Sequence, residues 1–409
     1  MTRLHQQPSA HSLIADDFME RERLSISGCL FFSCHQSLMQ AIKYSIALTA
    51  FFVAAYFYFN RTVPDFDDSE LSPGGEGSVA IVLRASYMQV AANLPPEEKP
   101  DFYAGKALAK QPWVKAPSAT FSRDGLGPLF NARSCMACHA NGGRGAVPLK
   151  DGKPLFSALV RLSLPGENKI NGVIEEPNYG AQFQPQSTSL ASQLGNVIQN
   201  LIPEIIDPPD EGDVSVVWYK KVFIYPDGER VILGSPTVEF SKLGYGEMHR
   251  DSLHSLRNAP PLHGMGLLEA IAEQDILKQQ DKLDADSDGV SGRANEVWDV
   301  ELGRTVLGRF GWKASQPSVR QQTAAAFVND VGISSPIFPA QPCTQNQTAC
   351  LDEEHGNEWD EYSQIHVELP ENMLALTVKF TRNLAVPKRE IEVNQELLRG
   401  RALFYKSSC

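Results

Sequence analysis

Residues 124–145 read DGLGPLFNARSCMACHANGGRG, and the rest of the chain can be organised around this stretch. At its centre, the five residues from Cys135 to His139, CMACH, form a Cys-x-x-Cys-His motif. In such a motif both thiols add across the vinyl groups of a haem, and the adjacent imidazole is the proximal ligand of the iron. The sequence therefore predicts a covalently bound c-type haem held by Cys135, Cys138 and His139.

The same cysteine pair has two alternative interpretations, a redox dithiol and half of a zinc site. A thioredoxin-like pair expects a strand and a helix N-terminus behind it, and a zinc knuckle expects a second closely spaced ligand pair. Here a glycine-rich run, residues 142–145, follows at once, and it suits a backbone packed close to a flat cofactor. The histidine directly after the second cysteine favours haem.

The composition is that of a soluble globular protein. With 409 residues, 42% apolar and 21% charged, the chain can bury one large core or two smaller ones. The 37 basic and 49 acidic residues give a net charge of -12. That balance argues against nucleic acid or an anionic membrane surface as the main partner, and it favours a small cationic redox partner.

The seven cysteines include one pair that suits a disulfide. Cys343 and Cys350 are separated by six residues in a turn-rich segment, PAQPCTQNQTACLDEEHG. A disulfide here would close a small loop and would indicate an oxidising compartment. The alternative is two unpaired surface thiols.

The N-terminal region contains the only apolar run that could be an export signal. Residues 1–38 resemble no folded element, and we interpret them as a non-native or disordered extension. If translation starts at Met39, residues 39–60 form a signal peptide or an uncleaved membrane anchor with its apolar part at 46–59. An acidic linker, 61–78, follows. We expect a periplasmic, secreted or inner-membrane-anchored protein, and we discount the haem-like CLFFSCH run at 29–35 because it precedes this signal.

Patterns along the remaining chain predict a mainly α fold with a small inserted β region. Helical spacing is expected at about 80–110, 267–280, 319–328 and 372–381. β-branched and aromatic residues at 156–164 and 214–233 predict strands, and the turn at 226–228, Pro-Asp-Gly, predicts a hairpin.

The end of the chain repeats its centre. Leu129-Phe130 precedes Cys135 by the same spacing with which Leu403-Phe404 precedes Cys409. We interpret residues 396–409 as the start of a truncated second cytochrome c domain, with Cys409 as its first haem cysteine. Residues 79–395 would then hold the first haem. The expectation is one haem in this chain and two in the complete protein. The alternative is a helical C-terminus that ends on a cysteine by chance.

The chain resembles the bacterial di-haem oxidoreductase family, a peroxidase-like family also catalogued as thiol oxidoreductases. The resemblance covers roughly residues 70–409. It rests on the haem stretch and on four further blocks: RNAPPLHGMGLLEAI from Arg257, DADSDGVSGRANEVWD from Asp284, LGRFGWKASQPSVRQQTAAAFVNDVGISSPIFP from Leu307, and FTRNLAVPKR from Phe380. It implies two cytochrome-c-like domains with covalent haems and an electron-transfer or peroxidase-like activity.

The block from Leu307 combines cations with aromatic residues. Arg309, Lys313 and Arg320 could neutralise haem propionates, and Trp312 could relay electrons between two haems. The alternative is an amphipathic helix entry with a core tryptophan.

The iron's sixth ligand has to come from another part of the chain. His263 and Met265, in a glycine-flanked loop, are the first candidates, and Met248 and His249 are the second. If none of them binds, the iron is open to peroxide, whose cleavage needs an acid–base group. Glu269 could serve as that group; the alternative is a solvated glutamate at a helix start.

A calcium loop is the remaining site prediction. Asp284, Asp286 and Asp288 alternate, and Gly289 permits a sharp turn at the sixth position. The twelfth position is Asn295 rather than glutamate, so the EF-hand pattern is incomplete. The alternative is a polar turn whose aspartates lie in water.

We therefore expect an enzyme that passes electrons from a small redox donor protein through one haem to peroxide at the other. Two alternatives stay open. One is a plain electron carrier with six-coordinate irons. The other is a thiol–disulfide oxidoreductase that works through Cys135 and Cys138.

Overall fold

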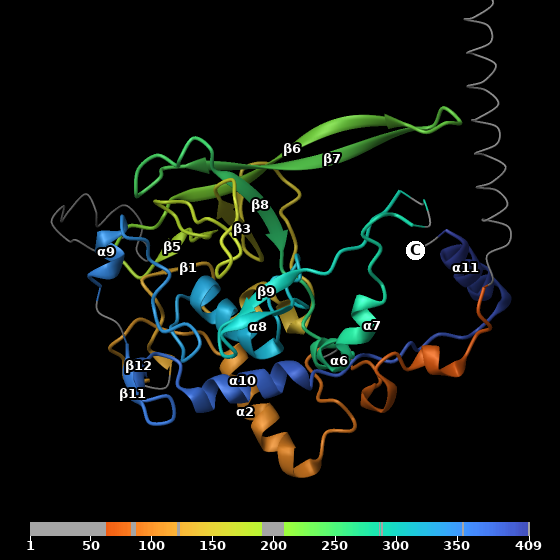
Figure 1. Ribbon diagram of the computed structural model, residues 1–409, viewed down its shortest axis with the longest axis horizontal. Helices are drawn as coiled ribbons and strands as arrows, with labels where there is room; N and C mark the ends of the chain where they lie inside the picture. The colour runs from red at the N-terminus through yellow and green to blue at the C-terminus, as the bar shows by residue number, and fades with distance from the viewer. Residues whose placement is uncertain are drawn as a thin grey trace, which may run out of the picture. The chain divides into compact units, whose positions relative to one another are not determined.

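The computed structural model describes residues 63–82, 87–120, 123–189, 208–285, 287, 289–353 and 356–407 (Figure 1). The chain divides into two compact units, Met1–Asp67 with Ile391–Cys409, and Asp68–Glu390. The predicted N-terminal extension and signal or anchor (1–60) and Cys409 lie outside the described residues. Within the described residues no helix combines the length and the apolar character needed to cross a bilayer.

The helices of the larger unit are short. Among its described residues, the α-helices are α2 (Lys99–Lys110), α3 (Cys135–Cys138), α6 (Met265–Ala270), α7 (Glu273–Leu277), α8 (Val319–Ala326), α9 (Thr348–Leu351) and α10 (Glu371–Arg382). The 3₁₀ turns are η1 (Asp68–Leu71), η2 (Gly75–Gly77), η3 (Pro96–Glu98) and η5 (Ala140–Gly142), and a π-helical turn, η6 (Phe327–Val331), continues α8. The described part of the predicted linker 61–78 therefore contains η1 and η2.

Two three-stranded sheets share one apolar core. One has the order β4 (Gln182–Phe183), β3 (Ala158–Ser163), β8 (Leu253–Asn258), and the other β2 (Lys153–Pro154), β6 (Asp213–Ile224), β7 (Arg230–Ser241). Residues alternate along β3 between buried and half-buried, so Val160 and Leu162 face the core while Arg161 lies on the opposite face.

The described part of the larger unit also contains three smaller antiparallel pairs. They are β1 (Leu129–Phe130) with β5 (Gln186–Ser187), β9 (Glu296–Asp299) with β10 (Arg304–Leu307), and β11 (Glu358–Asp360) with β12 (Ile365–Val367).

The predicted hairpin is confirmed. β6 and β7 pair along their whole length, from Asp213 with Ser241 to Ile224 with Arg230, and the turn closes where Tyr225 N–H donates to the carbonyl of Glu229 over 2.9 Å. Figure 1 shows this hairpin as the longest strand pair of the larger unit.

Helices α2 and α10 pack closely and form the base on which the haem motif lies. Phe102 and Phe380 are fully buried between them, with ring centroids 5.3 Å apart. Gly105 allows the close approach, since a Cβ there would lie 2.0 Å from the carbonyl oxygen of Leu376. Cys135 and Met136 pack against this same apolar cluster.

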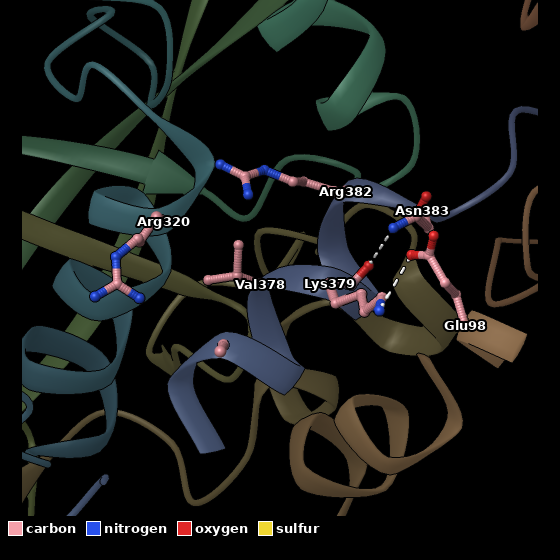
Figure 2. A pocket seen from close by; sticks show the side chains of 7 residues that line it. Glu98, Arg320, Val378, Lys379, Arg382 and Asn383 are labelled. Carbon is pink, nitrogen blue, oxygen red and sulfur yellow. Dashed lines mark hydrogen bonds and ion pairs between the residues drawn. The ribbon is translucent and has the colours of Figure 1, made fainter. Parts of the chain in front are cut away.

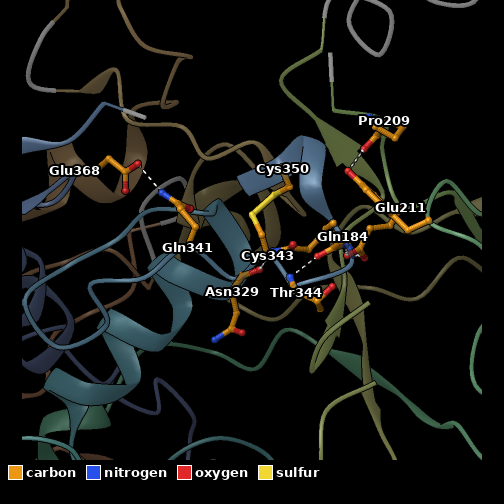
Figure 3. Close-up of a disulfide and its surroundings, with 11 residues drawn as sticks. Gln184, Pro209, Glu211, Asn329, Gln341, Cys343, Thr344, Cys350 and Glu368 are labelled. Carbon is orange, nitrogen blue, oxygen red and sulfur yellow. Dashed lines mark hydrogen bonds between the residues drawn. A yellow bond between two sulfur atoms is a disulfide. The ribbon is translucent and has the colours of Figure 1, made fainter. Parts of the chain in front are cut away.

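The predicted disulfide is also confirmed, since Cys343 and Cys350 are bonded (Figure 3). The loop that it closes and the residues just before it contact two buried carboxylates. Gln341 donates to Glu368 over 2.5 Å, and Gln347 donates to Glu211 over 2.6 Å. The cross-link therefore holds a segment that organises buried polar groups.

The prediction of a mainly α protein is corrected, because the structure is 26% helical and 22% strand and so is a mixed fold. One reason is the region 80–110, where α2 is the one α-helix among the described residues, 80–82 and 87–110. Pro95 and Pro96 interrupt the pattern, and Val90 instead forms a bridge with Leu384. Many of the strands are also too short to produce a clear alternating pattern in the sequence.

The smaller unit is described over 63–67 and 391–407. Its helix, α11 (Gln395–Lys406), begins at Asn394, whose side chain accepts a hydrogen bond from Leu397 N–H over 2.9 Å. Arg401 donates to the carbonyl of Pro64 over 2.6 Å and lies 4.8 Å from the centroid of the Tyr405 ring. The predicted Leu403-Phe404 pair is on this helix and is exposed.

Candidate functional site

The Cys-x-x-Cys-His motif forms one helical turn, α3, that is fixed at its entry. The backbone N–H groups of Asn131 and Ala132 both donate to the carbonyl of Asp330, over 2.8 and 3.0 Å. Arg133 exchanges hydrogen bonds with the backbone of Trp113, which is buried. The approach to Cys135 is therefore attached to η6 and to the main apolar core.

Neither thiol of the motif takes part in a disulfide. Cys135 and Cys138 are free, and each is half-buried. Burial raises the pKa of both thiols to about 12, and the nearby Asp330 carboxyl adds to the shift. A dithiol enzyme needs the opposite, a lowered thiol pKa, because the thiolate is the nucleophile.

His139 is oriented as a metal-binding histidine would be. Its Nδ1 lies 2.6 Å from the carbonyl oxygen of Pro260. A carbonyl only accepts hydrogen bonds, so Nδ1 carries the proton and Nε2 keeps its lone pair for a metal. Burial also lowers the pKa of His139, which favours the neutral, ligating form.

The glycine-rich run after the motif packs against backbone. A Cβ on Gly142 would lie 2.6 Å from the carbonyl oxygen of Tyr87, and one on Gly145 would lie 2.2 Å from that of Ser157. Gly142 also has φ +75°, a left-handed conformation that favours glycine. Close protein backbone contacts are enough to require glycine at these two positions, and contact of the run with a flat cofactor stays a prediction.

A second family block runs beside this loop. Leu262 N–H donates to the carbonyl of Gly142 over 2.9 Å, Gly145 N–H donates to Ala259 over 2.9 Å, and the Asn258 amide donates to Gly145 over 2.7 Å. The fold thus brings the block that starts at Arg257 into contact with the residues after His139.

The predicted axial ligands occupy different positions. The His263 ring stacks on Tyr87 with centroids 4.6 Å apart, and its buried Nδ1 has no hydrogen-bond partner among the described residues. Met265 packs against the main core at the start of α6. Met248 packs against the core that contains Val160 and Leu162 of β3. The backbone N–H of His249 donates to the Glu176 carboxylate over 2.8 Å. None of these contacts involves the Nε2 side of His139.

Two of the three predicted propionate cations already have partners. Arg309 donates to the carbonyls of Leu268, Glu269 and Ile271 and so caps α6. Arg320 forms a bidentate ion pair with Glu371, over 2.8 Å at both contacts, and also pairs with Glu301. Lys313 is exposed and forms no ion pair with the described residues.

Trp312 lies beside the motif and outside the core. It is 51% exposed, which argues against a core packing role. Its indole N–H donates to the carbonyl of Asn258 over 2.7 Å, and the Arg144 guanidinium lies 6.0 Å from its ring centroid. Both contacts connect it to the segments around the haem motif.

The predicted acid–base residue, Glu269, has structural contacts. One carboxylate oxygen accepts from Val319 N–H, over 2.8 Å, at the first turn of α8, and the side chain forms an ion pair with Arg382. Arg382 also lines a cavity of about 350 Å³ with Glu98, Arg320 and Lys379 (Figure 2). In Figure 2 Lys379 and Arg382 lie on α10, Arg320 lies on α8 and Glu98 lies at the end of η3, and Lys379 pairs with Glu98 over 3.1 Å.

The structure describes only one of the three aspartates of the predicted calcium loop, because Asp286 and Asp288 lie outside the described residues. The Asp284 carboxylate accepts from Gly289 N–H over 3.2 Å. The described residues contain no group of three carboxylate, histidine or cysteine side chains placed to hold a metal ion. Calcium binding stays a prediction.

A polar network behind the motif was missed by sequence reasoning. Arg161 donates to the Gln182 side chain over 2.8 Å, and Gln182 in turn donates to the Asp330 carboxylate over 2.8 Å. Burial raises the pKa of Asp330, and the hydrogen bond from Gln182 and the charges of Arg161 and His139 oppose that shift. These residues are far apart in the sequence, so no local pattern connects them.

Together, two reduced thiols one helical turn apart and an imidazole with a free Nε2 fit a covalently attached haem. The geometry suits this class of site. Residues 72–409 match the family described as "di-haem oxidoreductase, putative peroxidase", and the chain belongs to this family. No curated protein and no solved structure matches the chain.

Proposed function

We propose that this protein is an exported di-haem oxidoreductase that transfers electrons to peroxide. Its first haem would be attached covalently through Cys135 and Cys138, with His139 as proximal ligand. The observation that carries this proposal is the hydrogen bond from His139 Nδ1 to Pro260, because it leaves Nε2 free beside two reduced thiols.

A haem bound here would supply one-electron transfer, and peroxide reduction if its second axial position stays open. The chain's own residues would hold and orient it. Pro260 fixes the ring plane and tautomer of His139, and the α2–α10 cluster supports Cys135. Trp312, which is half-exposed and bonded to Asn258, would extend an electron path toward a partner or a second haem.

The leading alternative is an electron carrier in which both axial positions are filled. The observation that favours it is His263, whose buried Nδ1 has no partner among the described residues and whose block contacts the motif. A thiol–disulfide oxidoreductase is disfavoured, because burial raises the pKa of both thiols to about 12.

Export is supported by the Cys343–Cys350 disulfide, since disulfides persist in oxidising compartments such as the periplasm. The predicted signal or inner-membrane anchor at 46–59 would provide the route. The net charge of -12 favours a small cationic protein as the electron donor.

Spin state and cyanide binding test the peroxidase proposal against the carrier. In the haem-loaded chain we expect a high-spin ferric component that binds cyanide and is lost in the presence of excess cyanide. A ferric spectrum that is low-spin throughout and unchanged by cyanide would support the carrier and contradict peroxide reduction at this haem.

A further inference from the structure

We propose that Arg257 binds a propionate carboxylate of the haem attached at Cys135 and Cys138. The inference rests on the proposed function, because it requires haem at that motif. It assigns an anion-binding residue at a position that the sequence patterns did not indicate.

The first argument is the position of Arg257 on the sheet. β3 and β8 pair antiparallel, with Leu159 opposite Arg257 and Arg161 opposite Ser255. Side chains opposite each other share a face, so Arg161 and Arg257 lie diagonally on the face that is turned away from Val160 and Leu162.

This face of the sheet is turned toward the haem motif. Gln182, which pairs with Arg161 across β4, donates to Asp330 and also to the Asn131 side chain over 2.7 Å. Asn131 lies four residues before Cys135. At the other end of β8, Asn258 donates to Gly145, and Pro260 accepts from His139. Arg257 is therefore three residues from the group that orients the proximal histidine.

The second argument is the lack of a partner. The Arg257 side chain is half-buried, yet its guanidinium forms no hydrogen bond or ion pair with any described residue. Burial alone lowers the pKa of Arg257, and no acid opposes the shift. A partly desolvated guanidinium without an anion is costly, and a carboxylate ligand would remove that cost.

The third argument is the local charge. Arg161 also faces this region, and its charge adds to that of Arg257. The acids near them are Asp330, which bonds through Gln182 to Arg161, and Glu175, which also acts on Arg161. Neither acid is paired with Arg257, so no described acid neutralises the charge of its guanidinium.

The other arginine candidates are less suitable. Arg309 caps α6 and Arg320 pairs with two glutamates, so each would have to leave its partners before it could bind a propionate. Arg257 needs no such rearrangement. A guanidinium is also suited to a carboxylate because it can donate two parallel hydrogen bonds.

The test compares midpoint potentials in the haem-loaded full chain for the wild type, Arg257→Gln, Arg257→Lys and Arg230→Gln. A cation near the haem disfavours the ferric state, so Arg257→Gln should have a lower potential than the wild type. Its potential should also become more dependent on pH between about 5 and 8, because the propionate loses the cation that holds its pKa down. Arg257→Lys keeps the charge and should stay closer to the wild type than Arg257→Gln does.

Arg230→Gln is the matched control, because Arg230 is exposed at the far end of the hairpin. It should behave as the wild type does.

If Arg257→Gln retains covalent haem with an unchanged potential and pH profile, the inference is wrong. If Arg257→Gln loses haem, the proposal is tested on Arg257→Lys instead. A near-wild-type midpoint potential in Arg257→Lys supports the proposal, and loss of haem from Arg257→Lys overturns it. A shift that depends on added acetate would also overturn it, since it would indicate a site for free anions. A wild type without covalent haem would instead contradict the proposed function itself.

Discussion

At the scale of single residues, the site depends on one backbone acceptor. The Pro260 carbonyl selects the His139 tautomer, and Pro260 follows a strand whose backbone and side-chain hydrogen bonds fix its position. The motif itself could be predicted from sequence, because its five residues are contiguous. Pro260, Asp330 and Arg257 could not, because only the tertiary fold brings them to the motif.

Replacing His139 should remove the iron's proximal ligand. We expect His139→Ala to lose the imidazole-ligated absorption spectrum of the haem-loaded chain, because the side chain that carries Nε2 is gone. The control is Cys343→Ser, which removes a loop cross-link worth about 2 to 3 kcal/mol and no haem contact. The two variants should therefore differ in their spectra, and equal loss of the ligated spectrum in both would contradict the role of His139.

Glu368 should make stability depend on pH. Burial raises the pKa of Glu368 from 4.5 to about 7, against opposing hydrogen bonds from Ser334 and Gln341. The unfolded chain loses this proton near pH 4.5 and the folded chain only near pH 7. The folded state therefore binds more protons across this window, and stability falls as pH rises from about 4.5 to about 7, by about 3 kcal/mol for this group.

Urea unfolding of the wild type and Glu368→Gln at several pH values measures this effect. The stability of the wild type relative to Glu368→Gln should fall across the window and stay flat above it. Glu229→Gln, at the exposed hairpin turn, is the control and should follow the wild type. Parallel pH profiles for the wild type and Glu368→Gln would show that Glu368 does not titrate there.

At the scale of elements, the α2–α10 pair is the support on which the haem turn rests. The sequence predicted α10 almost in full, since 372–381 was expected and Glu371–Arg382 is observed. The helix predicted at 80–110 was longer than α2, because the apolar spacing before Lys99 resembles that of a helix. Pro95 and Pro96 prevent an α-helix at that point. The crossing of the two helices was not visible in the sequence, because it depends on Gly105 meeting Leu376.

Gly105→Ala should destabilise the larger unit. The added Cβ would meet the Leu376 carbonyl carbon at 2.6 Å and the Phe380 Cβ at 2.9 Å, so the helices would have to separate. We expect a loss of about 1 to 3 kcal/mol in the free energy of unfolding. Gly400→Ala on α11 is the matched control, because nothing lies within 4 Å of its added Cβ. That change should be neutral or should stabilise its helix by up to about 1 kcal/mol, and equal losses in both variants would contradict the packing argument.

At the scale of the whole chain, the larger unit is a mixed α and β fold built around connections between distant segments. Long-range contacts such as β3 with β8 bring the block from Arg257 to the haem motif. Within these two segments, His139 and Pro260 are hydrogen-bonded although they are 121 positions apart in the chain. Periodicity predicted the long hairpin and two of the longer helices well. It could not predict two-residue strands such as β1, which are defined by their partners rather than by their own sequence.

Covalent haem attachment is the claim on which the whole account depends. The direct measurement is the mass of the peptide that contains Cys135 and Cys138, after expression of the full chain in a host with haem-attachment machinery. We predict a wild-type peptide heavier by the mass of one haem, with both thiols resistant to alkylation, and no such increase in the Cys135→Ala/Cys138→Ala double variant. A wild-type peptide of unmodified mass whose two thiols react with an alkylating agent would contradict the account.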